Sequence, residues 1–439
     1  MCSLGLTEEM EEKASMKRFG IIADDLTGAM DTGVGFARIG LDTIISFGNE
    51  VASEASVVVI STDSRADDGE TAYRKTRKEA HKLAGLYVYK KIDSTLRGNI
   101  SSELWAVIDA LHTEKTIMCP AFPANKRSVV DGKLLVENTP VNETYFAHDP
   151  TCPVTEAHIP TLLHKQGGFQ VGSIDLEGVK KGPSYIAQQI LESEQRVIVV
   201  DAVKQVHLRY IARALAMGSG SWLPCGSAGL ASELPLAFGY RTRDVKPAGP
   251  IMSRNPVLLV IGSRNDATAR QLKEAEIRLN LPLISIEPSE FAHRKGRIAR
   301  INQLAREVSN LMSCGRSVII TSTLSRYVPA LKGSTAGILA AIAVRAARRW
   351  DIAGLILSGG DVARATCQAL GVTGIRILRE LQPGIVVGEM TGSMKEGMRV
   401  VTKAGGFGSD DAMVDAICYL KGNEKGGTEK KTCTRHNHG

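Results

Sequence analysis

The sequence lacks the motifs by which most nucleotide-binding enzymes are recognised. It contains no G-x-x-x-x-G-K-[ST] loop, and no G-x-G-x-x-G follows an expected strand. A G-x-S-x-G elbow for nucleophilic hydrolysis is missing as well. These absences disfavour a P-loop enzyme, an ordinary Rossmann dehydrogenase and a nucleophile-elbow hydrolase.

Cysteine gives no indication of a metal or redox site. The eight cysteines are scattered, with no C-x-x-C pair and no Cys/His cluster of zinc spacing. Most of them stand in apolar surroundings, which is typical of buried thiols in a reducing compartment. Because the N-terminal stretch also lacks a signal-peptide pattern, we expect a cytoplasmic location.

Long hydrophobic runs and aromatic residues are scarce. The longest apolar stretches, such as QRVIVVDAV and NPVLLVIGS, have the length of a strand, so we expect no membrane span. The formal charge is +7, but aromatic residues make up only 5% and do not alternate with basic ones, which disfavours a nucleic-acid partner. A small anionic substrate accounts for the positive balance, and so does a solvated basic surface.

The two ends of the sequence have the composition of disordered segments. Residues 1–16 are polar and acidic and are predicted to form a disordered lead-in, with Met16 as an alternative start to Met1. Residues 422–439, with the sequence GNEKGGTEKKTCTRHNHG, are predicted to form a disordered tail.

The chain contains a regular alternation of strand and helix patterns. Such alternation predicts an α/β fold with mainly parallel sheets and flanking helices. We expect two domains of this kind, at 17–240 and 257–421, joined by a proline-containing linker at 241–256, with the active site in the cleft between them. The first strands are expected at 19–24, 42–48, 56–62, 86–93 and 115–122.

Residues 122–160 interrupt this alternation. They carry many prolines and turn residues and little helical periodicity. We expect a long ordered excursion there, with a hairpin around Asp131-Gly132.

Two adjacent aspartates follow the first expected strand, in the stretch IIADDLTGAMDTG. Asp24 and Asp25 repel each other and lose hydration there unless positive charge or a ligand lies nearby. An equally open explanation is that one of them caps the next helix while the other faces water.

Further charged residues occupy the ends of other expected strands. In parallel sheets, ligands bind beyond the carboxyl ends of the strands. Carboxylates there can bind sugar hydroxyls or take the proton of an attacking hydroxyl, and Arg65 and Lys91 can hold a substrate carboxylate. For each residue taken singly, ion pairing within the domain is the alternative. The set consists of Asp24, Asp25, Arg65, Lys91, Asp93, Ser94 and Arg97.

Three segments of the second domain share the order strand, Gly/Ser turn, helix. They are LLVIGSRNDAT, LILSGGDVARA and VTKAGGFGSDDA. A glycine turn that opens a helix lets backbone N–H groups approach an anion, and the helix dipole adds favourable potential. Glycine also serves such turns for steric reasons alone. Three turns in one domain favour a site for nucleotide phosphates.

Taken together and in order, the motifs of the chain resemble the four-carbon acid sugar kinase family, which includes D-threonate, D-erythronate and 3-oxo-tetronate kinases. The likeness spans residues 17–420. No single motif is decisive, but the ordered set is specific. The motifs are IIADDLTGAMDTGVGFAR, KKIDSTLRGNI, PAFPANKR with TPVNETYFAHDP, GSAGLA, LILSGGDVA and KAGGFGSDDAM.

The resemblance implies an acid-sugar-binding first domain, a nucleotide-binding second domain, and phosphorylation of the terminal (4-)hydroxyl by ATP. It implies ATP and Mg²⁺ as cofactors and is compatible with a homodimer. One of Asp24 and Asp25 would act as the catalytic base, and which one stays open. The sugar acid would contact Asp24, Asp25, Arg65, Lys91, Ile92, Asp93 and Ser94. ATP would contact Ser263, Gly359, Gly360, Asp361, Val362 and Gly405.

The sequence departs from the family pattern at two places. Val362 stands where relatives often have a hydroxyl residue, which weakens the case for a side-chain contact to ATP. The segment SRND after Gly262 differs from the Cys and second Ser of 3-oxo-tetronate members. The resemblance therefore favours D-threonate as substrate, with D-erythronate and 3-oxo-tetronate as alternatives.

Two other functions stay open. A dehydrogenase or aldolase acting on sugar acids would need a dinucleotide fingerprint or a Schiff-base lysine; no fingerprint is visible, and Lys91 is the candidate lysine. A non-catalytic sugar-acid sensor would bind its ligand without nucleotide.

Overall fold

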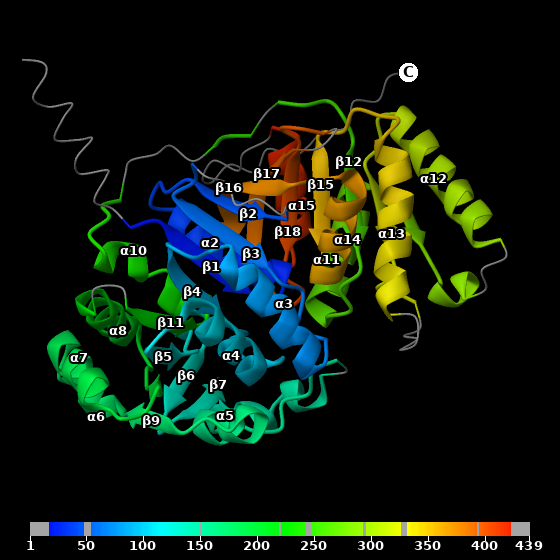
Figure 1. Cartoon of the computed structure of the whole chain (residues 1–439). Coiled ribbons are helices and arrows are strands. Elements are labelled where there is room, and N and C mark those ends of the chain that lie inside the picture. Colours follow the sequence, from blue (N-terminus) through cyan, green and yellow to red (C-terminus); the bar gives the residue numbers. More distant parts are fainter. Residues whose placement is uncertain are drawn as a thin grey trace, which may run out of the picture. The chain divides into compact units, whose positions relative to one another are not determined.

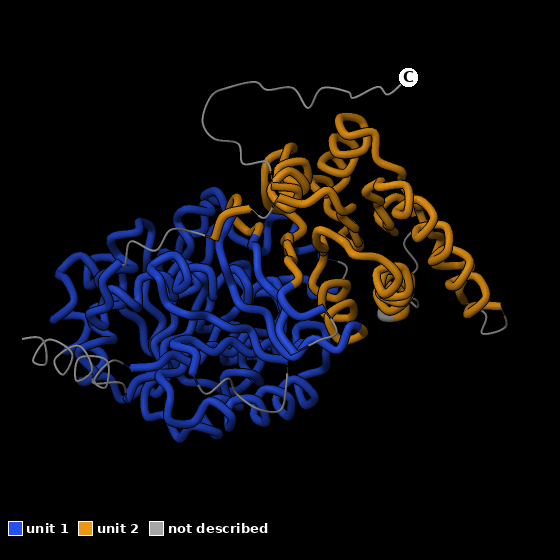
Figure 2. The backbone as a smooth tube through the Cα atoms, turned by 90° about the horizontal axis from the view of Figure 1, so that it is seen from above, with its two compact units in different colours: residues 1–247, 370–380, 386–397 blue, residues 248–369, 381–385, 398–439 orange. Residues whose placement is uncertain are grey.

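The structure is a computed structural model, and the chain in it forms two compact units (Figure 2). Unit 1 comprises residues 1–247, 370–380 and 386–397, and unit 2 comprises residues 248–369, 381–385 and 398–439. The predicted lead-in, residues 243–247 and 251 of the predicted linker, and residues 423–439 of the predicted tail lie outside the described residues. The structure describes residues 17–47, 54–149, 151–218, 221–242, 248–250, 252–292, 296–325, 332–392 and 395–422.

Unit 1 is built on a mainly parallel sheet (Figure 1). In spatial order its strands are β16 (Gly374–Gln382), β2 (Thr43–Ser46), β3 (Val57–Ser61), β1 (Phe19–Ala23), β4 (Tyr87–Lys91), β11 (Trp222–Gly226), β5 (Lys115–Cys119), β10 (Val197–Val200) and β9 (Val171–Ile174). The pairs from β2 to β9 are parallel, whereas β16 runs antiparallel to β2. The central strand β1 is buried along its whole length, as expected for a strand covered on both faces.

Helices form two rows along this sheet. In one row α3 (Gly69–His81) packs on α4 (Ile100–Leu111), which packs on α5 (Ile159–Gly167). In the other, α2 (Leu26–Ala37), α9 (Ala228–Ala231), α8 (Gln205–Met217) and α7 (Pro183–Glu192) pack in sequence, with α6 (Leu176–Lys180) and α10 (Leu234–Ala237) against α8. The connections β1–α2–β2 and β3–α3–β4 run in opposite directions along the sheet. Because both crossovers are right-handed, α2 and α3 lie on opposite faces.

The excursion at 122–160 contains a small antiparallel sheet. It consists of β6 (Arg127–Val130), β7 (Lys133–Val136) and β8 (Thr139–Pro140). The predicted hairpin is confirmed, because Val130 pairs with Lys133 across Asp131 and Gly132. Both turn residues have positive φ, 50° and 68°, as a two-residue turn that matches strand twist requires.

Unit 2 is a smaller parallel α/β unit. In spatial order its strands are β13 (Leu283–Ser285), β14 (Val318–Thr321), β12 (Val257–Ile261), β15 (Gly354–Ser358) and β18 (Arg399–Lys403). Helix α11 (Asp266–Leu279) packs on α15 (Ala412–Leu420), and α12 (Arg297–Ser313) packs on α13 (Lys332–Ala347). Helix α14 (Gly360–Leu370) follows β15 directly.

A hairpin that the sequence analysis did not anticipate follows α14. Strand β16 is hydrogen-bonded to β17 (Ile385–Thr391). The turn between them is Pro383-Gly384, where Gly384 has φ +73°. Most of both strands belongs to unit 1, whereas the turn between them belongs to unit 2. The polypeptide therefore enters unit 2 three times, at residues 248, 381 and 398, and returns to unit 1 twice, at residues 370 and 386.

No helix within the described ranges is long and apolar enough to cross a bilayer.

Candidate functional site

Strand order in unit 1 brings three polar turns together. Strand β1 pairs with β3 on one side and β4 on the other, in register from end to end. The turns after the three strands are therefore neighbours. The backbone ties two of them together, since Thr62 N–H donates to the Ala23 carbonyl at 2.9 Å and Ser64 N–H donates to the Asp24 carbonyl at 3.0 Å.

Arg65 lies at the centre of these turns and bonds three carboxylates. Its Nε and Nη2 donate to the two oxygens of Asp24 at 2.6 and 2.9 Å. Nη1 and Nη2 donate to the two oxygens of Asp25, both at 2.9 Å. A carboxylate oxygen of Asp93 lies 3.4 Å from Nη1. This single guanidinium therefore offsets the repulsion between the adjacent aspartates.

Asp25 also caps helix α2. Its Oδ1 accepts from the N–H of Gly28 at 2.8 Å, and its Oδ2 accepts from Thr27 Oγ1 at 2.6 Å. The capping explanation is thus correct for Asp25. The other half of that explanation is wrong, because Asp24 does not face water: its exposed fraction is 3%.

The turn after β4 is organised around Asp93. Its Oδ1 accepts from Thr95 N–H at 2.7 Å, and its Oδ2 accepts from Arg97 Nη2 at 2.8 Å. Arg97 also reaches Asp149 at 3.1 Å. Burial alone would raise the pKa of Asp93, but Arg97 and Arg65 beside it lower that pKa far below its ordinary value. Burial likewise opposes ionisation of Asp24, and Arg65 nevertheless lowers the pKa of this carboxyl.

Lys91 differs from Arg65 in that no carboxylate among the described residues is bonded to its ammonium; the charges of Asp24, Asp31 and Asp93 act on it only through space. The residue is 4% exposed, and its Nζ lies beside Gly28, where an added Cβ would be 2.9 Å away. Among the described residues, its ammonium makes neither a hydrogen bond nor an ion pair. A nearly buried cation that is not hydrogen-bonded to an anion is costly. Of the two cations predicted to hold a substrate carboxylate, Lys91 therefore has the free charge, whereas Arg65 is already occupied.

The remaining predicted residues of this group have different environments. Ile92 has a buried side chain, and its N–H donates to the Gly226 carbonyl at 2.9 Å. Ser94 is half-buried. Of these two, only Ser94 can offer a side chain to a ligand.

Asp31 is a carboxylate that the sequence analysis did not single out. It lies on α2 three residues after Gly28, so the two share a helix face. Its half-buried carboxylate has no hydrogen bond or ion pair within the described part of the chain. Burial raises the pKa of Asp31, and the nearby Lys91 charge opposes that rise. Asp31 could have been found from the sequence, because it follows Asp24 by seven positions, which is two turns of a helix, and so lies on the same side of α2.

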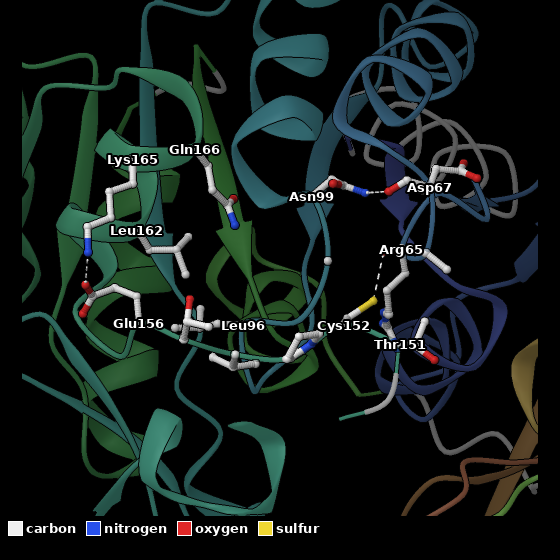
Figure 3. A pocket seen from close by; sticks show the side chains of 15 residues that line it. Arg65, Asp67, Leu96, Asn99, Thr151, Cys152, Glu156, Leu162, Lys165 and Gln166 are labelled. Carbon is white, nitrogen blue, oxygen red and sulfur yellow. Dashed lines mark hydrogen bonds and ion pairs between the residues drawn. The ribbon is translucent and has the colours of Figure 1, made fainter. Parts of the chain in front are cut away.

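A pocket of about 230 Å³ adjoins this cluster (Figure 3). In its wall the Cys152 Sγ donates to the Arg65 carbonyl at 3.2 Å, and the Asn99 amide donates to the Asp67 carbonyl at 2.8 Å. Arg65 is the one predicted acid-binding residue in its lining. The pocket is thus a neighbour of the carboxylate cluster.

In unit 2 the predicted nucleotide residues follow three adjacent strands. β15 pairs with β12 on one side and β18 on the other, which brings together the turns containing Ser263, Gly359 and Gly405. Gly359 has φ +100°, and a Cβ there would lie 3.3 Å from the Ser263 nitrogen. A Cβ on Gly405 would lie 2.5 Å from Ser263 Oγ. Glycine is therefore required for this close approach.

Thr268 links two of these turns. Its hydroxyl lies 3.0 Å from Ser263 Oγ and 2.8 Å from the Gly405 carbonyl. The two residues that open α14 face different ways: Asp361 is exposed, whereas Val362 is buried against Gly262, where a Cβ would be 2.4 Å from Val362 Cγ2. Position 362 can therefore meet a nucleotide only through its backbone.

Comparison with known proteins identifies the family. A sugar-binding N-terminal domain matches residues 19–234, and a nucleotide-binding C-terminal domain matches residues 258–413. D-threonate kinase of Salmonella typhimurium is 33% identical over 91% of this chain and 98% of its own. The chain belongs to the four-carbon acid sugar kinase family. The family resemblance seen in the motifs is confirmed.

Other members of the family show the same extent of similarity. D-threonate kinase of Bordetella bronchiseptica is 34% identical over 92% of this chain and 97% of its own, and D-erythronate kinase of Heliobacterium modesticaldum is 30% identical over the same shares. A solved Salmonella typhimurium LT2 structure superposes with a TM-score of 0.75 at 25% identity, covering 91% of this chain and 98% of that one. A Haemophilus influenzae structure, at 24% identity and a TM-score of 0.68, shares the fold.

Proposed function

We propose that the protein is an ATP-dependent kinase that phosphorylates the terminal hydroxyl of D-threonate, giving the 4-phospho acid and ADP. D-erythronate and 3-oxo-tetronate are the alternative acids. D-threonate is favoured because two relatives with that activity are 33% and 34% identical, compared with 30% for a D-erythronate kinase and 27–29% for four 3-oxo-tetronate kinases; a third D-threonate kinase is 28% identical. A kinase that consumes ATP would act in the cytoplasm, which is the location we infer.

The observation that carries the proposal is the unpaired Lys91 ammonium beside a satisfied cluster of carboxylates. A sugar acid offers one carboxylate, which would bind Lys91, and several hydroxyls, which would donate to carboxylate oxygens. Asp24, Asp25 and Asp93 are held in fixed orientations by Arg65, so little side-chain entropy is lost when the acid binds. Ile92 would contribute its backbone and Ser94 its hydroxyl.

For the proton transfer we assign separate roles to Asp24 and Asp25, which precede α2, and to Asp31 within it. Asp24 and Asp25, the proposed catalytic pair, orient the acceptor hydroxyl from the cluster around Arg65. Asp31 receives the proton, because its carboxylate has no hydrogen bond or ion pair in the described ranges and burial raises its pKa above the ordinary value. A carboxylate held by an arginine is a weaker proton acceptor than an unpaired one.

The nucleotide would bind in unit 2 at the turns containing Ser263, Gly359, Gly360 and Gly405. Backbone N–H groups at such turns bind phosphate oxygens, and the N-terminus of α14 adds favourable potential. Phosphoryl transfer needs mainly positioning and charge stabilisation, so a covalent nucleophile is not required.

Mg²⁺ would bind together with the phosphates. Mg²⁺ is usually held by one or two carboxylates, water and substrate phosphates rather than by a full protein cage. Across the described ranges, no group of three or more His, Cys, Asp or Glu side chains is placed to form a cage. The exposed Asp361 carboxylate beside the glycine turn fits such a partial role. The ion would neutralise charge on the transferred phosphoryl group.

A substrate screen tests the proposal. Purified protein is incubated with MgATP and each of D-threonate, L-threonate, D-erythronate and the 3-oxo-tetronates, and ADP release is followed by a coupled assay. The expected result is the highest kcat/KM with D-threonate. ATP turnover that is independent of every acid would contradict the proposal.

A further inference from the structure

A buried lysine lies beneath the turns of the nucleotide site. Lys403 is the last residue of β18 and is 1% exposed. Its ammonium donates to the carbonyls of Ala404 and Gly405 at 3.0 and 2.8 Å and to Thr268 Oγ1 at 3.2 Å. All three acceptors are neutral. In the described part of unit 2 no carboxylate pairs with this charge.

An uncompensated buried charge costs free energy, which its hydrogen bonds to neutral acceptors offset only in part. Burial lowers the pKa of Lys403 to about 8, and no charged neighbour counteracts the shift. Of the charged groups on the surrounding elements, Asp266 and Asp361 are exposed and Arg264 donates to the carbonyl of Ser322. Asp410 and Asp411 are paired with Arg270 and Arg278. The ammonium therefore lies in a local region of positive potential.

The predicted ATP contacts contain no positive charge. They are serine, valine and glycine residues together with one aspartate, although a triphosphate is strongly anionic. Lys403 lies directly under them. It pairs in register with Ser358, the residue before Gly359, and its carbonyl accepts from the Gly359 N–H at 3.4 Å. Through Thr268 it also reaches Ser263, and its own Nζ holds the Gly405 carbonyl.

We propose that Lys403 is the positioning residue of the nucleotide site: it holds the Ser263 and Gly405 turns and supplies the positive potential that attracts the phosphates of a nucleoside triphosphate. The assignment rests on the proposed function of unit 2. Because its three N–H donors are already used, Lys403 acts through the turns and through its field rather than by contacting phosphate.

Isothermal titration calorimetry with MgATP, in the absence of any sugar acid, tests the assignment. Three proteins are compared at pH 7 and pH 9: wild type, Lys403→Met and Lys403→Arg. At pH 7, Lys403→Met should bind about tenfold more weakly, the order expected for one charge acting over about 12 Å at an effective dielectric of about 20. Lys403→Arg keeps the charge and should bind nearly as tightly as wild type.

The pH comparison separates the field of Lys403 from a merely structural role. Wild-type affinity should fall several-fold between pH 7 and pH 9 as Lys403 loses its proton. Both variants should show a smaller change over that range, because neither titrates there. The titration of ATP itself is common to all three proteins and cancels. If Lys403→Met does not fold, the difference in pH dependence of ATP affinity between wild type and Lys403→Arg still tests the role of the Lys403 charge.

Equal affinities and equal pH profiles in all three proteins would overturn the assignment. Because the measurement is of ATP binding alone, it is independent of the acid. Binding as expected without phosphorylation of any acid would refute the proposed function and leave the role of Lys403 intact. Turnover of D-threonate by wild type, together with an unchanged ATP affinity in Lys403→Met, would refute the role of Lys403 and leave the proposed function intact.

Discussion

Arg65 and Lys91 show how two cations in one site can have different tasks. The planar guanidinium of Arg65 hydrogen-bonds Asp24 and Asp25 at once and forms an ion pair with Asp93. Its charge is therefore already compensated within the protein. The ammonium of Lys91 makes no such bonds to the described residues. We therefore infer that Arg65 organises the acid site and that Lys91 binds its ligand.

Substitution of the two cations should separate these tasks. Arg65→Met leaves buried carboxylates unpaired and should lower the free energy of unfolding by about 3–5 kcal/mol. Lys91→Met removes a nearly buried charge that has no bonded anion, so stability should be unchanged or higher, whereas the KM for the acid should rise roughly 10- to 100-fold, the worth of one charge-assisted hydrogen bond. Chemical denaturation and steady-state kinetics measure both, with the KM for ATP as an internal control. A stable Arg65→Met protein with an unchanged acid site would contradict this division.

Asp31→Asn tests the proposed proton acceptor. The amide cannot take the proton, so kcat should fall about 10²- to 10⁴-fold while the KM for the acid stays within a few-fold of wild type. Asp24→Asn and Asp25→Asn serve as comparisons and should raise the KM as well as lower kcat, because both residues orient the hydroxyl. Normal turnover by Asp31→Asn would show that Asp31 is not the proton acceptor, and the role would fall to Asp24 or Asp25.

At the level of the element, the start of helix α2 connects the fold to the site. Gly28 in its first turn leaves room for two functional groups: an added Cβ would lie 2.6 Å from Asp25 Oδ1 and 2.9 Å from Lys91 Nζ. A glycine here costs helix stability, by up to about 1 kcal/mol relative to alanine. The close approach of the Lys91 ammonium to the helix backbone explains why the position is glycine.

Gly28→Ala should therefore weaken the site more than the fold. The displaced ammonium and carboxylate should raise the KM for the acid at least severalfold, while the midpoint of thermal unfolding changes little, because better helix propensity offsets the crowding. Gly337→Ala in α13, where a Cβ meets nothing within 4 Å, is the matched control and should leave the KM unchanged. Equal kinetics in the two variants would refute the crowding argument.

Local patterns predict some elements better than others. The strands of the parallel sheets could be predicted because their residues are β-branched and buried on both faces, as in the buried strands β1 and β12. The β16–β17 hairpin could not be placed, because β16 pairs with β2 more than 300 positions earlier in the chain. Likewise, strand ends predicted that Asp24, Arg65 and Asp93 share one edge. They did not predict that Arg65 hydrogen-bonds Asp24 and Asp25 and forms an ion pair with Asp93. The partners of a side chain depend on non-local geometry.

On the scale of the whole molecule, two aspartates of the proposed sugar-acid site, Asp24 and Asp93, contribute to the pH dependence of stability. The pKa of Asp24 and of Asp93 is lowered from the ordinary value of 3.8, so each contributes stability that is fully present above that pH. This stability is lost as pH falls through the lowered pKa values. Wild type should thus lose free energy of unfolding below about pH 4, and Asp93→Asn should lose less over the same interval. Denaturant titrations from pH 6 to pH 3 measure how steeply the free energy of unfolding falls with pH in wild type and in Asp93→Asn. An equal fall in the two proteins would contradict a lowered pKa of Asp93.

The central claim is that a four-carbon sugar acid bound in unit 1 receives the terminal phosphoryl group of ATP on its C4 hydroxyl. NMR of the product formed from D-threonate and MgATP tests it most directly, because coupling between phosphorus and C4 identifies the esterified carbon. The account predicts stoichiometric ADP and a single phosphoester at C4, formed by Lys91→Met roughly 5- to 50-fold more slowly than by wild type at an acid concentration that half-saturates wild type. ADP release without a phosphoester, or a phosphoester at another carbon, would contradict it.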